Sequence, residues 1–548
     1  MLHELAIMEH RRTLGAVLEE RSREVPHRPF LRFGRDELTF AQTNAASDRL
    51  AVGLAGLGVG AGEPAIMMLP NRDDYVISWF ALAKLGAPAM GLDPAMSVDR
   101  LAGMLRLTGA RVLIADARSL ARIESAAAGT AVETIVICDG FEDLAGRADS
   151  RFAIRSLEEL ESFAGERPRA TIGGSDLAML LTTSGSTGTP KACELPHRTA
   201  LRIAETHVEA LSLRSTDVLF CPFPLFHIDA SLLTVVPALL LGACAAIGSG
   251  FDAEAFWEEA EEAGATIIDL LGDSLASLSR LPPLASDSTN GVRLAWGAYL
   301  ADPALADEFE RRFDLRMAGG MYGLTDVAIV AYQPLDEPQR AGSAGKPVRS
   351  FDLRIFDEFD EEVPSGEVGE VVVRPTEPWA MSTGYYSMPE ATLEGSRNLW
   401  RHTGDLGHLD ADGYLYIRGR KAHETGRESG SASLLAIEDT VGAHPEVVEA
   451  AAFRVGEDAD AEVKVCVVPV AGSALDPTVI WAFCEEKLAA DGIPRYLELL
   501  PALPKTPTRK VEKYELQRDW LTPGTVDRRS RRIRDFSRDA HPQSEEIG

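Results

Sequence analysis

"LLTTSGSTGTPKACELPHR", residues 180–198, joins an apolar segment to a loop of glycines and hydroxyl residues that ends at Lys191. Small residues directly after a strand leave backbone N–H groups free to point at one ligand, while hydroxyls add donors and a lysine adds positive charge. A Walker loop is excluded, because that pattern ends in Gly-Lys-Ser/Thr and here Pro190 precedes the lysine. We therefore predict a different phosphate-binding loop, made by Thr183, Ser184, Gly185, Ser186, Thr187, Gly188 and Lys191.

Around this loop, strand and helix patterns alternate along the chain. The expected elements are a helix at 38–59, a strand at 64–70, a helix at 75–87 that Gly86 closes, and strands at 110–116 and 132–140. Such alternation predicts an α/β fold with a largely parallel sheet. From about Phe351, segments of alternating apolar and polar residues separated by glycine turns predict a small antiparallel, barrel-like part.

With 548 residues the chain is too long for one core, so we expect at least two domains. A boundary is expected at residues 419–422, followed by two strand patterns and a helix at 477–490, which is the size of a small α+β domain. The charge-rich segment 522–548 is expected to be a loose or disordered arm.

Composition limits the partners and the location. The formal charge of −29 argues against nucleic acid or an anionic membrane as a partner. The apolar stretches are too short to span a bilayer, and the N-terminus lacks a signal-peptide pattern, so we expect a cytoplasmic protein. The six cysteines lack metal-ligand spacing and are expected to be buried free thiols.

Further motifs follow the loop in order: "PLFHIDA" (224–230), "GGMYGLTD" (319–326), "WRHTGDLGHLDADGYLYIRGR" (400–420) and "LPKTPTRKVEK" (503–513). Together they resemble the adenylate-forming, AMP-binding enzymes, which include acyl- and aryl-CoA ligases, peptide-synthetase adenylation domains and luciferases. The resemblance covers about residues 14–520. "FHIDA", with "GATIIDLLG" (264–272) interpreted as the end of a helix, places it nearest the carnitine/crotonobetaine-CoA ligase branch.

The resemblance implies a large N-terminal domain at 1–419, a hinge at 420–422 and a mobile C-terminal lid domain at 423–521. It also implies that ATP and Mg²⁺ are required, and that a carboxylate is joined to the α-phosphate with release of pyrophosphate. Two anions must then meet, so the site needs positive charge and hydrogen-bond donors.

The resemblance assigns each catalytic or binding role to the residue of this chain that matches the family motif. Lys510 is expected to bridge the carboxylate and the α-phosphate, Thr325 to bond the α-phosphate, and His227 to gate the acid pocket. Asp326 is expected to hold Mg²⁺ in a position where the family usually has glutamate. The other expected nucleotide contacts are the loop, the backbone of Gly297, Ala298 and Tyr299, the Tyr322 ring on adenine, Asp405 on the ribose, and Arg420.

Some residues keep two interpretations. His227 is either a pocket residue or a satisfied core histidine. Asp229 and Asp273 are either pocket acids, which would suit an amino-bearing substrate, or residues exposed to solvent or capping a helix. Arg509 stands where the family has glycine, which predicts a stiffer loop at Lys510.

The hinge segment "GRKAHETGRESGSASLLAIE" (419–438) departs from the family pattern in its middle, where Thr425 and Gly426 replace an Ile-Lys pair and Ser429 replaces a glycine that lets pantetheine pass. CoA is therefore an uncertain acceptor. The alternatives are an amine or carrier-protein acceptor, nitrite as the activated anion with an aromatic amine, or a degenerate homologue that only binds nucleotide. The substrate is expected to be a small acid or amine, and a homodimer remains open.

Overall fold

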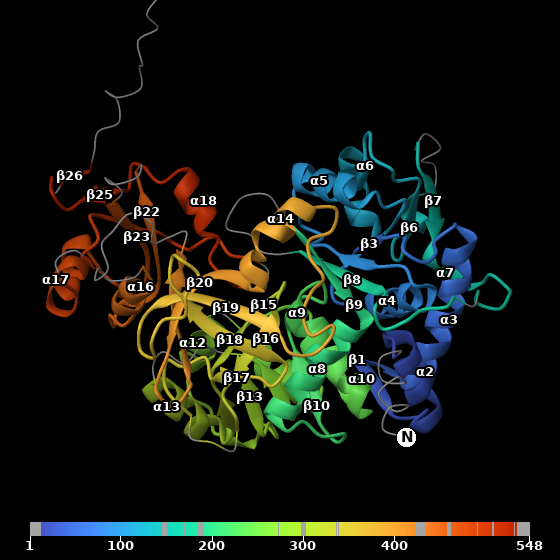
Figure 1. Cartoon of the computed structure of the whole chain (residues 1–548), viewed down its shortest axis with the longest axis horizontal. Coiled ribbons are helices and arrows are strands. Elements are labelled where there is room, and N and C mark those ends of the chain that lie inside the picture. The colour runs from blue at the N-terminus through green and yellow to red at the C-terminus, as the bar shows by residue number, and fades with distance from the viewer. Residues whose placement is uncertain are drawn as a thin grey trace, which may run out of the picture. The chain divides into compact units, whose positions relative to one another are not determined.

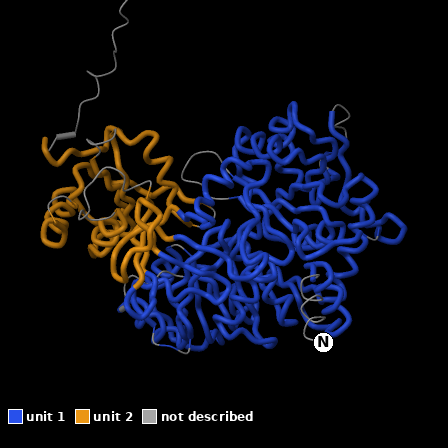
Figure 2. The backbone as a smooth tube through the Cα atoms, in the orientation of Figure 1, with its two compact units in different colours: residues 1–354, 372–403, 410–415 blue, residues 355–371, 404–409, 416–548 orange. Residues whose placement is uncertain are grey.

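The structure is a computed structural model, and its chain divides into two compact units (Figures 1 and 2). Unit 1 contains residues 1–354, 372–403 and 410–415, and unit 2 contains residues 355–371, 404–409 and 416–548. The structure describes residues 12–144, 151–168, 170–182, 191–271, 273–297, 303–335, 337, 339–421, 434–456, 462–489, 492–506, 509–530 and 532–533.

Unit 1 contains a first sheet of seven described strands in the order β14-β13-β12-β10-β11-β1-β2. Neighbouring strands are parallel except for the pair β1 and β2. The strands are β1 (Pro29–Phe33), β2 (Asp36–Thr39), β10 (Val218–Cys221), β11 (Cys244–Ile247), β12 (Ile267–Asp269), β13 (Leu294–Trp296) and β14 (Arg316–Ala318). The expectation of a helix end at 264–272 is wrong, because Ile267–Asp269 is a buried strand between two others.

One face of the first sheet packs against helices. Phe220, Ile268 and Ala295 share a core with apolar residues of α11 (Phe256–Glu262), α12 (Ser274–Ser279) and α13 (Pro303–Phe313). Because side chains alternate along a strand, the next residue of each strand points to the opposite face. The last residues of β10, β12 and β13 therefore share the face away from α11, α12 and α13.

A second sheet of unit 1 has the order β7-β6-β5-β3-β4-β8-β9 and is parallel except for the pair β8 and β9. Its strands are β3 (Ala65–Met68), β4 (Ala89–Gly91), β5 (Val112–Ala115), β6 (Thr134–Ile137), β7 (Ala153–Ser156), β8 (Leu177–Thr182) and β9 (Ala192–Pro196). The expected α/β fold with largely parallel sheets is confirmed.

Helices pack on the second sheet (Figure 1): α4 (Asp73–Leu85) contacts β3 and β4, and α5 (Val98–Thr108) and α6 (Leu120–Ala126) share its core. Next to α4 lie α3 (Phe40–Gly56), which also contacts α7 (Leu157–Glu161), and α2 (Leu14–Glu24). The expected helices at 38–59 and 75–87 are α3 and α4. A capping box of Thr39 and Gln42 starts α3, and Gly86 ends α4 with a left-handed φ of 72°.

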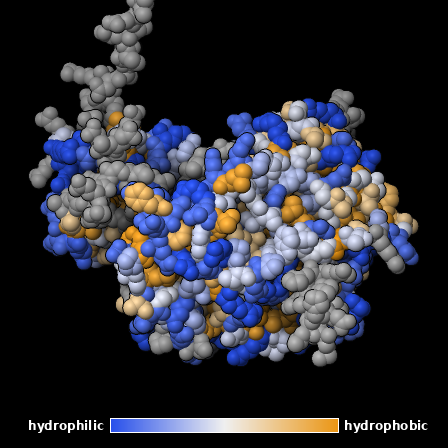
Figure 3. All heavy atoms as spheres, viewed as in Figure 1, coloured by the Kyte–Doolittle hydropathy of each residue, from blue (hydrophilic) through white to orange (hydrophobic). Residues whose placement is uncertain are grey.

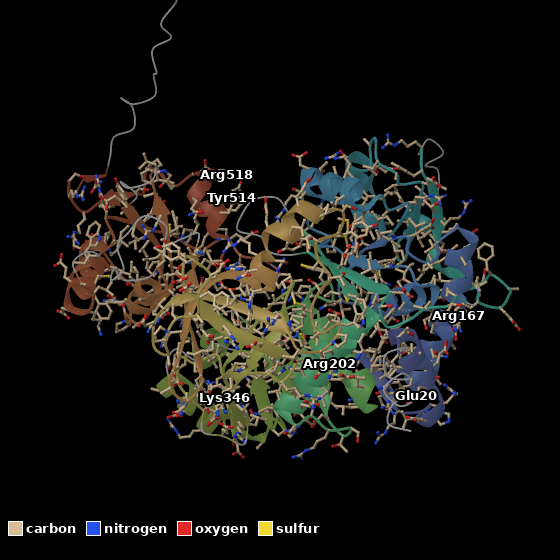
Figure 4. The ribbon with its side chains drawn as sticks, viewed as in Figure 1. Glu20, Arg167, Arg202, Lys346, Tyr514 and Arg518 are labelled. Atoms are coloured by element: carbon tan, nitrogen blue, oxygen red, sulfur yellow. The ribbon has the colours of Figure 1, made fainter. Side chains whose placement is uncertain are left out.

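Two further helices of unit 1 frame the site described below. The first is α8 (His197–Leu211). The second helical stretch contains α9 (Ile228–Ala230), the π-helical turn η3 (Ser231–Val235) and α10 (Val236–Leu241). Arg202 of α8, labelled in Figure 4, pairs with Glu377, and Thr199 donates to the carbonyl oxygen of Trp379 at 2.9 Å. These contacts hold α8 against the segment that leads to Tyr385.

The remaining strands of unit 1 begin with an antiparallel sheet of β15 (Met321–Leu324), β16 (Ala328–Tyr332) and β17 (Lys346–Pro347). A four-stranded sheet, divided between the units, contains β18 (Phe351–Phe356), β19 (Gly369–Pro375), β20 (Arg401–Leu409) and β21 (Leu415–Arg420). Shorter helices are α14 (Pro389–Glu394), η1 (Ala117–Ser119), η2 (Glu142–Leu144), η4 (Asp287–Thr289) and η5 (Arg397–Leu399).

Unit 2 has its own mixed sheet and core. The strands are β22 (Val447–Val455), β23 (Glu462–Pro469), β24 (Tyr496–Leu499), β25 (Val526–Asp527) and β26 (Arg532–Ile533), and the helices are α16 (Leu434–Gly442), α17 (Pro477–Lys487) and α18 (Lys513–Arg518). Ile437, Val465, Trp481 and Leu497 belong to its core. The segment that we expected to be a loose arm thus contributes β25 and β26.

The described helices include none that is long and apolar enough to cross a membrane. On the face viewed in Figure 3, hydrophobic residues are scattered among hydrophilic ones. All six cysteines are free thiols; five are buried and Cys138 is half-buried, as expected from the sequence.

Candidate active site

The predicted phosphate loop connects two paired strands of unit 1. β8 ends at Thr182, which pairs with Ala192 of β9. Thr183, Ser184, Gly185, Ser186, Thr187 and Gly188 lie outside the described residues, so their roles stay predictions. Lys191 is described and half-buried, and its ammonium lies 4.6 Å from the centroid of the Tyr385 ring.

The main chain around Tyr385 runs along β9 and so places this ring beside the end of the loop. Glu194 N–H donates to the carbonyl oxygen of Gly384 at 2.9 Å, and Tyr386 N–H donates to that of Ala192 at 2.8 Å. The guanidinium of Arg401 also lies against the ring, 4.8 Å from its centroid. Both cations are within the range of cation–π attraction. Our sequence reasoning missed Tyr385, because no quoted motif contains it.

Asp326 joins the same group of side chains. The β15–β16 hairpin places Thr325 and Asp326 in its connecting turn. Oδ2 of Asp326 accepts the Tyr385 hydroxyl at 2.7 Å and the Nη2 of Arg401 at 2.5 Å. Asp326 is 8% exposed and Arg401 is 5% exposed, so the guanidinium compensates a buried carboxylate. Arg401 lies in a motif that the sequence analysis quoted, but we had given it no role.

These contacts leave room for a metal at Asp326. The described residues contain no cluster of three or more acidic, histidine or cysteine side chains that could hold a metal ion. Mg²⁺ in nucleotide sites needs only one or two carboxylates, because phosphate oxygens and water supply its other ligands. Of the two carboxylate oxygens of Asp326, only Oδ2 takes hydrogen bonds from the described part of the chain, so Oδ1 fits such a role.

His227 and Asp229 lie at the start of the second helical stretch. His227 is the N-cap residue of α9, its side chain is 26% exposed, and its Nδ1 lies against Oδ2 of Asp229. Asp229 is 2% exposed, which excludes the interpretation of a solvated side chain. The Thr234 hydroxyl donates to the carbonyl oxygen of Asp229 at 2.9 Å within the π-helical turn. π-helical turns occur frequently at functional sites.

A second buried acid, Asp269, lies where the sequence analysis expected none. Cys221, Asp269 and Trp296 are the last residues of β10, β12 and β13 and share one face of the first sheet. The Cys221 thiol donates to Oδ2 of Asp269 at 3.3 Å. Oδ1 of Asp269 has no hydrogen-bond partner among the described residues. Ligands of open α/β sheets bind outside the carboxyl ends of the strands, which is this position.

Aromatic side chains lie near this acid, since Trp296 is its register partner in the sheet. His207 of α8 lies 4.4 Å from Trp296 between ring centroids, edge to face, and its Nδ1 is 2.5 Å from the Tyr332 hydroxyl. Both His207 and Tyr332 are buried. We define the group Cys221, His207, Asp229, Asp269, Trp296 and Tyr332 as the acid pocket.

Burial dominates the electrostatics of the acid pocket. Burial, and then the charge of Asp229, raise the pKa of Asp269 well above its ordinary value. Burial lowers the pKa of His207 to about 3, although Asp229 opposes this shift. Burial followed by the charges of Asp269 and Asp229 raises the pKa of the Tyr332 phenol. At neutral pH the imidazole and the phenol are therefore uncharged.

Gly297 follows Trp296 and borders the acid pocket. Its φ is +97°, and a Cβ at this position would lie 2.8 Å from Oδ1 of Asp269 and 2.7 Å from the carbonyl oxygen of Leu270. A side chain is therefore excluded on steric grounds as well as by backbone conformation. Ala298 and Tyr299 lie outside the described residues. Tyr322 is buried in β15, and Thr325 is half-buried.

Unit 2 contains the predicted ribose and hinge residues. Nε of Arg420 lies 2.7 Å from Oδ1 of Asp405, so the fold brings these two predicted residues together. Next to them, Glu370 accepts the Gly404 N–H at 3.2 Å and pairs with Lys421 at 2.8 Å. The sequence analysis had assigned no role to Glu370 or Lys421.

Lys510 is exposed on unit 2. The Thr506 N–H donates to the carbonyl oxygen of Lys510 at 2.8 Å, and Arg509 has a φ of +63°. This left-handed conformation normally favours glycine, which the family has at this position, so the arginine keeps the glycine-like backbone with strain.

Two other predictions concern the hinge segment and Asp273. Thr425, Gly426 and Ser429, which carry the departure from the hinge pattern, lie outside the described residues. Asp273 is half-buried at the N-cap position of α12, where its side chain makes no capping hydrogen bond.

Comparison with known proteins gives consistent matches over most of the chain. The model of the AMP-binding enzyme family matches residues 18–386, and that of the AMP-binding enzyme C-terminal domain matches residues 436–510. Crotonobetaine/carnitine–CoA ligases of Salmonella paratyphi A and of Escherichia coli O7:K1 are each 26% identical over 486 residues, which cover 88% and 87% of this chain and 93% of each relative.

Solved structures agree with these matches. An anthranilate CoA ligase in complex with anthranoyl-AMP has a TM-score of 0.80 and 25% identity, with 92% of this chain and 97% of that chain covered. The O-succinylbenzoate CoA synthetase of Bacillus subtilis with ATP and magnesium has a TM-score of 0.77 and 24% identity, with 91% and 98% covered. The second similarity supports the fold alone.

Proposed function

Because the chain belongs to the AMP-binding enzyme family, we propose that it activates a small acyl or aryl acid as its adenylate. The chain is an ATP-dependent, AMP-forming ligase of the acyl-CoA synthetase type. In the proposed reaction a carboxylate oxygen forms a bond to the α-phosphorus of ATP. The bond from this phosphorus to the bridging oxygen breaks, and pyrophosphate leaves. One solved relative binds the adenylate of an aminobenzoic acid, which supports an aryl acid here.

The observation that carries this proposal is the convergence of two motifs on Tyr385. Lys191 ends the predicted phosphate loop and lies against the Tyr385 ring, while Asp326 accepts the hydroxyl of the same residue. The two motif residues are far apart in the sequence, and the fold brings both to one side chain. A lysine and a carboxylate on one rigid aromatic support suit a triphosphate with its metal ion.

Residues of unit 1 would then bind the nucleotide and the acid. Lys191 would neutralise phosphate charge, and Thr325 would donate to the α-phosphate. When bound, Mg²⁺ would add positive charge at the phosphates, and Asp326 is the residue that would hold it. Tyr322 and the backbone at Gly297 would contact the base.

Residues of unit 2 would complete the reaction. Asp405 would accept the ribose hydroxyls, in which case Arg420, 2.7 Å away, would hold its carboxylate in orientation. Lys510 would stabilise the negative charge that develops as the carboxylate and the α-phosphate meet in the transition state. Its exposure fits a residue that contacts substrate rather than the core of its own unit.

Exchange of labelled pyrophosphate into ATP, screened over aliphatic and aromatic carboxylic acids, tests the proposal. We expect acid-dependent exchange for at least one class. ATP binding without exchange for any acid would instead support the degenerate, nucleotide-binding homologue.

Lys510→Ala tests the catalytic step. We expect at least about a 100-fold loss of exchange, because the removed charge acts on the transition state, while ATP binding measured by calorimetry changes little. Lys487→Ala, at an exposed lysine of α17, is the matched control and should keep full activity. An active Lys510→Ala enzyme would remove this residue from the mechanism.

A second candidate function keeps the adenylation and changes the acceptor or the activated anion. The unusual segment at 419–438 favours it, because the residues that the family uses for thioester formation are absent there. The acceptor would be an amine or a carrier protein, or nitrite would be activated and an aromatic amine would attack it.

The acceptor is tested by adding CoA, or nitrite with an aromatic amine, to an enzyme that performs exchange. A thioester and free AMP support the CoA ligase. An adenylate that persists despite CoA contradicts it. AMP formation that requires both nitrite and an aromatic amine supports the alternative route.

A further inference from the structure

The acid pocket contains a polar atom that the protein itself leaves without a partner. Asp269 is 1% exposed, its Oδ2 takes only a thiol as donor, and its Oδ1 takes no hydrogen bond from any described residue. A thiol is a weak donor, so even Oδ2 is poorly satisfied. Buried carboxyl groups normally have partners, and an exception calls for an explanation.

No cation of the described chain compensates this carboxyl group. No described lysine or arginine forms an ion pair with Asp269, and the charged neighbour that acts on it is another acid, Asp229. The negative charge of Asp229 disfavours the ionised form of Asp269. An N–H donor brought by a ligand would relieve this repulsion.

The position of Oδ1 shows where such a ligand would lie. Oδ1 is the atom that a Cβ on Gly297 would meet at 2.8 Å, so it borders the surface of the backbone that we assign to the nucleotide. Trp296 is the register partner of Asp269 and packs edge to face with His207, whose Nε2 also has no hydrogen-bond partner among the described residues. Aromatic side chains close to an orphan acceptor suit a ring that carries an N–H group.

We propose that Asp269, with Asp229, binds a primary amino group of the acid substrate, so that the enzyme selects amino-substituted carboxylic acids. This inference rests on the proposed function, since it assumes that the bound molecule is the acid that is adenylated. Asp269 would accept one N–H, and Asp229 would supply a second acceptor or the charge that favours an ammonium.

Matched pairs of acids test the selection. The 2-, 3- and 4-aminobenzoates are compared with the corresponding methylbenzoates, which have nearly the same shape, and 4-aminobutyrate is compared with pentanoate. The readout is kcat/KM in pyrophosphate exchange. For the best amino-substituted acid we expect a kcat/KM at least about tenfold above that of its methyl counterpart, since a site built for hydrogen bonding rejects the analogue that lacks the group. Comparing the aromatic pairs with the aliphatic pair shows whether the amine is carried by a ring or by a chain.

Asp269→Asn and Asp229→Asn identify the residues responsible. Either substitution should lower the ratio of kcat/KM for the amine to kcat/KM for its methyl counterpart to about threefold or less, with the larger loss on the amine. Asp252→Asn is the matched control, because this aspartate is exposed and takes no hydrogen bond except the Glu254 N–H from the described residues. A variant that lowers the rates for both members of a pair equally would show a structural role and overturn the proposal.

A binding experiment separates this inference from the proposed function. If no acid supports exchange, the proposed function fails, and calorimetric titration of the same aminobenzoate and methylbenzoate pairs still decides the amine site. Preferential binding of the amine that disappears in Asp269→Asn supports the site. Equal binding of both, or a preference that survives in both variants, refutes it.

Discussion

Asp326 and Asp269 are both buried carboxyl groups of unit 1, but their surroundings differ in almost every respect. Asp326 has a buried arginine and a tyrosine hydroxyl on one oxygen. Asp269 has a thiol on one oxygen, no hydrogen bond from the described residues on the other, and a second acid nearby. The protein itself supplies a cation that compensates the charge of Asp326. It supplies none to Asp269 among the described residues, which fits a carboxyl group that recognises a bound molecule.

The largest expected effect on the free energy of unfolding concerns Arg401, which compensates Asp326. Arg401→Ala would leave Asp326 buried without its cation, and we expect a loss of about 3–5 kcal/mol in the free energy of unfolding. Denaturant unfolding measures it. The double variant Arg401→Ala with Asp326→Asn should recover part of this loss, because the uncompensated charge is gone. A loss below about 1 kcal/mol in the single variant would show that the pair is not the structural support we describe.

The pH dependence of the free energy of unfolding should report the shifted pKa values of His207 and Asp269. The folded pKa of His207 is about 3, below its ordinary value near 6.5, so the unfolded chain binds a proton that the folded chain rejects, and stability falls as the pH falls through this window. The folded pKa of Asp269 is raised, so the folded chain binds the extra proton, and stability rises as the pH falls through that raised value.

His207→Gln and Asp269→Asn should therefore change the slope in opposite directions between pH 4.5 and 5.5. His207→Gln should flatten the loss of stability towards acid, and Asp269→Asn should steepen it, each by up to about 1.4 kcal/mol per pH unit. Denaturant unfolding at three pH values suffices for the measurement. Slopes that move in the same direction would contradict the assigned pKa shifts.

The smallest expected effect is the stability of Asp269→Asn at pH 7. The unfolded aspartate is ionised at this pH, whereas burial disfavours the charge in the folded chain, so an amide of the same shape removes a penalty. We expect the variant to be as stable as the parent within about 1 kcal/mol, or more stable. A destabilisation similar to that of Arg401→Ala would mean that the two carboxyl groups do not differ as we describe.

Much of the fold could be predicted because its signals are local. The helix at Asp73–Leu85 has an apolar pattern and ends at a glycine, and both signals lie within a few residues. The strand at Ile267–Asp269 was misinterpreted because so short an apolar run, two isoleucines before an aspartate, does not distinguish a strand from a helix end. Its neighbours in the sheet, β10 and β13, decide its conformation, and no local pattern records them.

The candidate site divides in the same way. Lys191, Asp326 and Asp405 belong to motifs whose spacing is visible in one chain. Tyr385 is placed by main-chain pairing with β9, and Asp269 meets His207 only because a strand end and a helix converge. Such contacts carry no sequence signal, although Arg401 could have been suspected from its place in a quoted motif.

The π-helical turn at Ser231–Val235 has a consequence for how this protein could acquire new substrates. An α-helix turns by about 100° per residue, so losing one residue from this turn would restore regular geometry and rotate the preceding residues, Asp229 among them, by about that angle. Deletion of a single codon could therefore move Asp229 out of the acid pocket without substituting any residue of the pocket. We therefore expect related sequences that differ in specificity to differ in the length of this short segment, and not only by point substitutions.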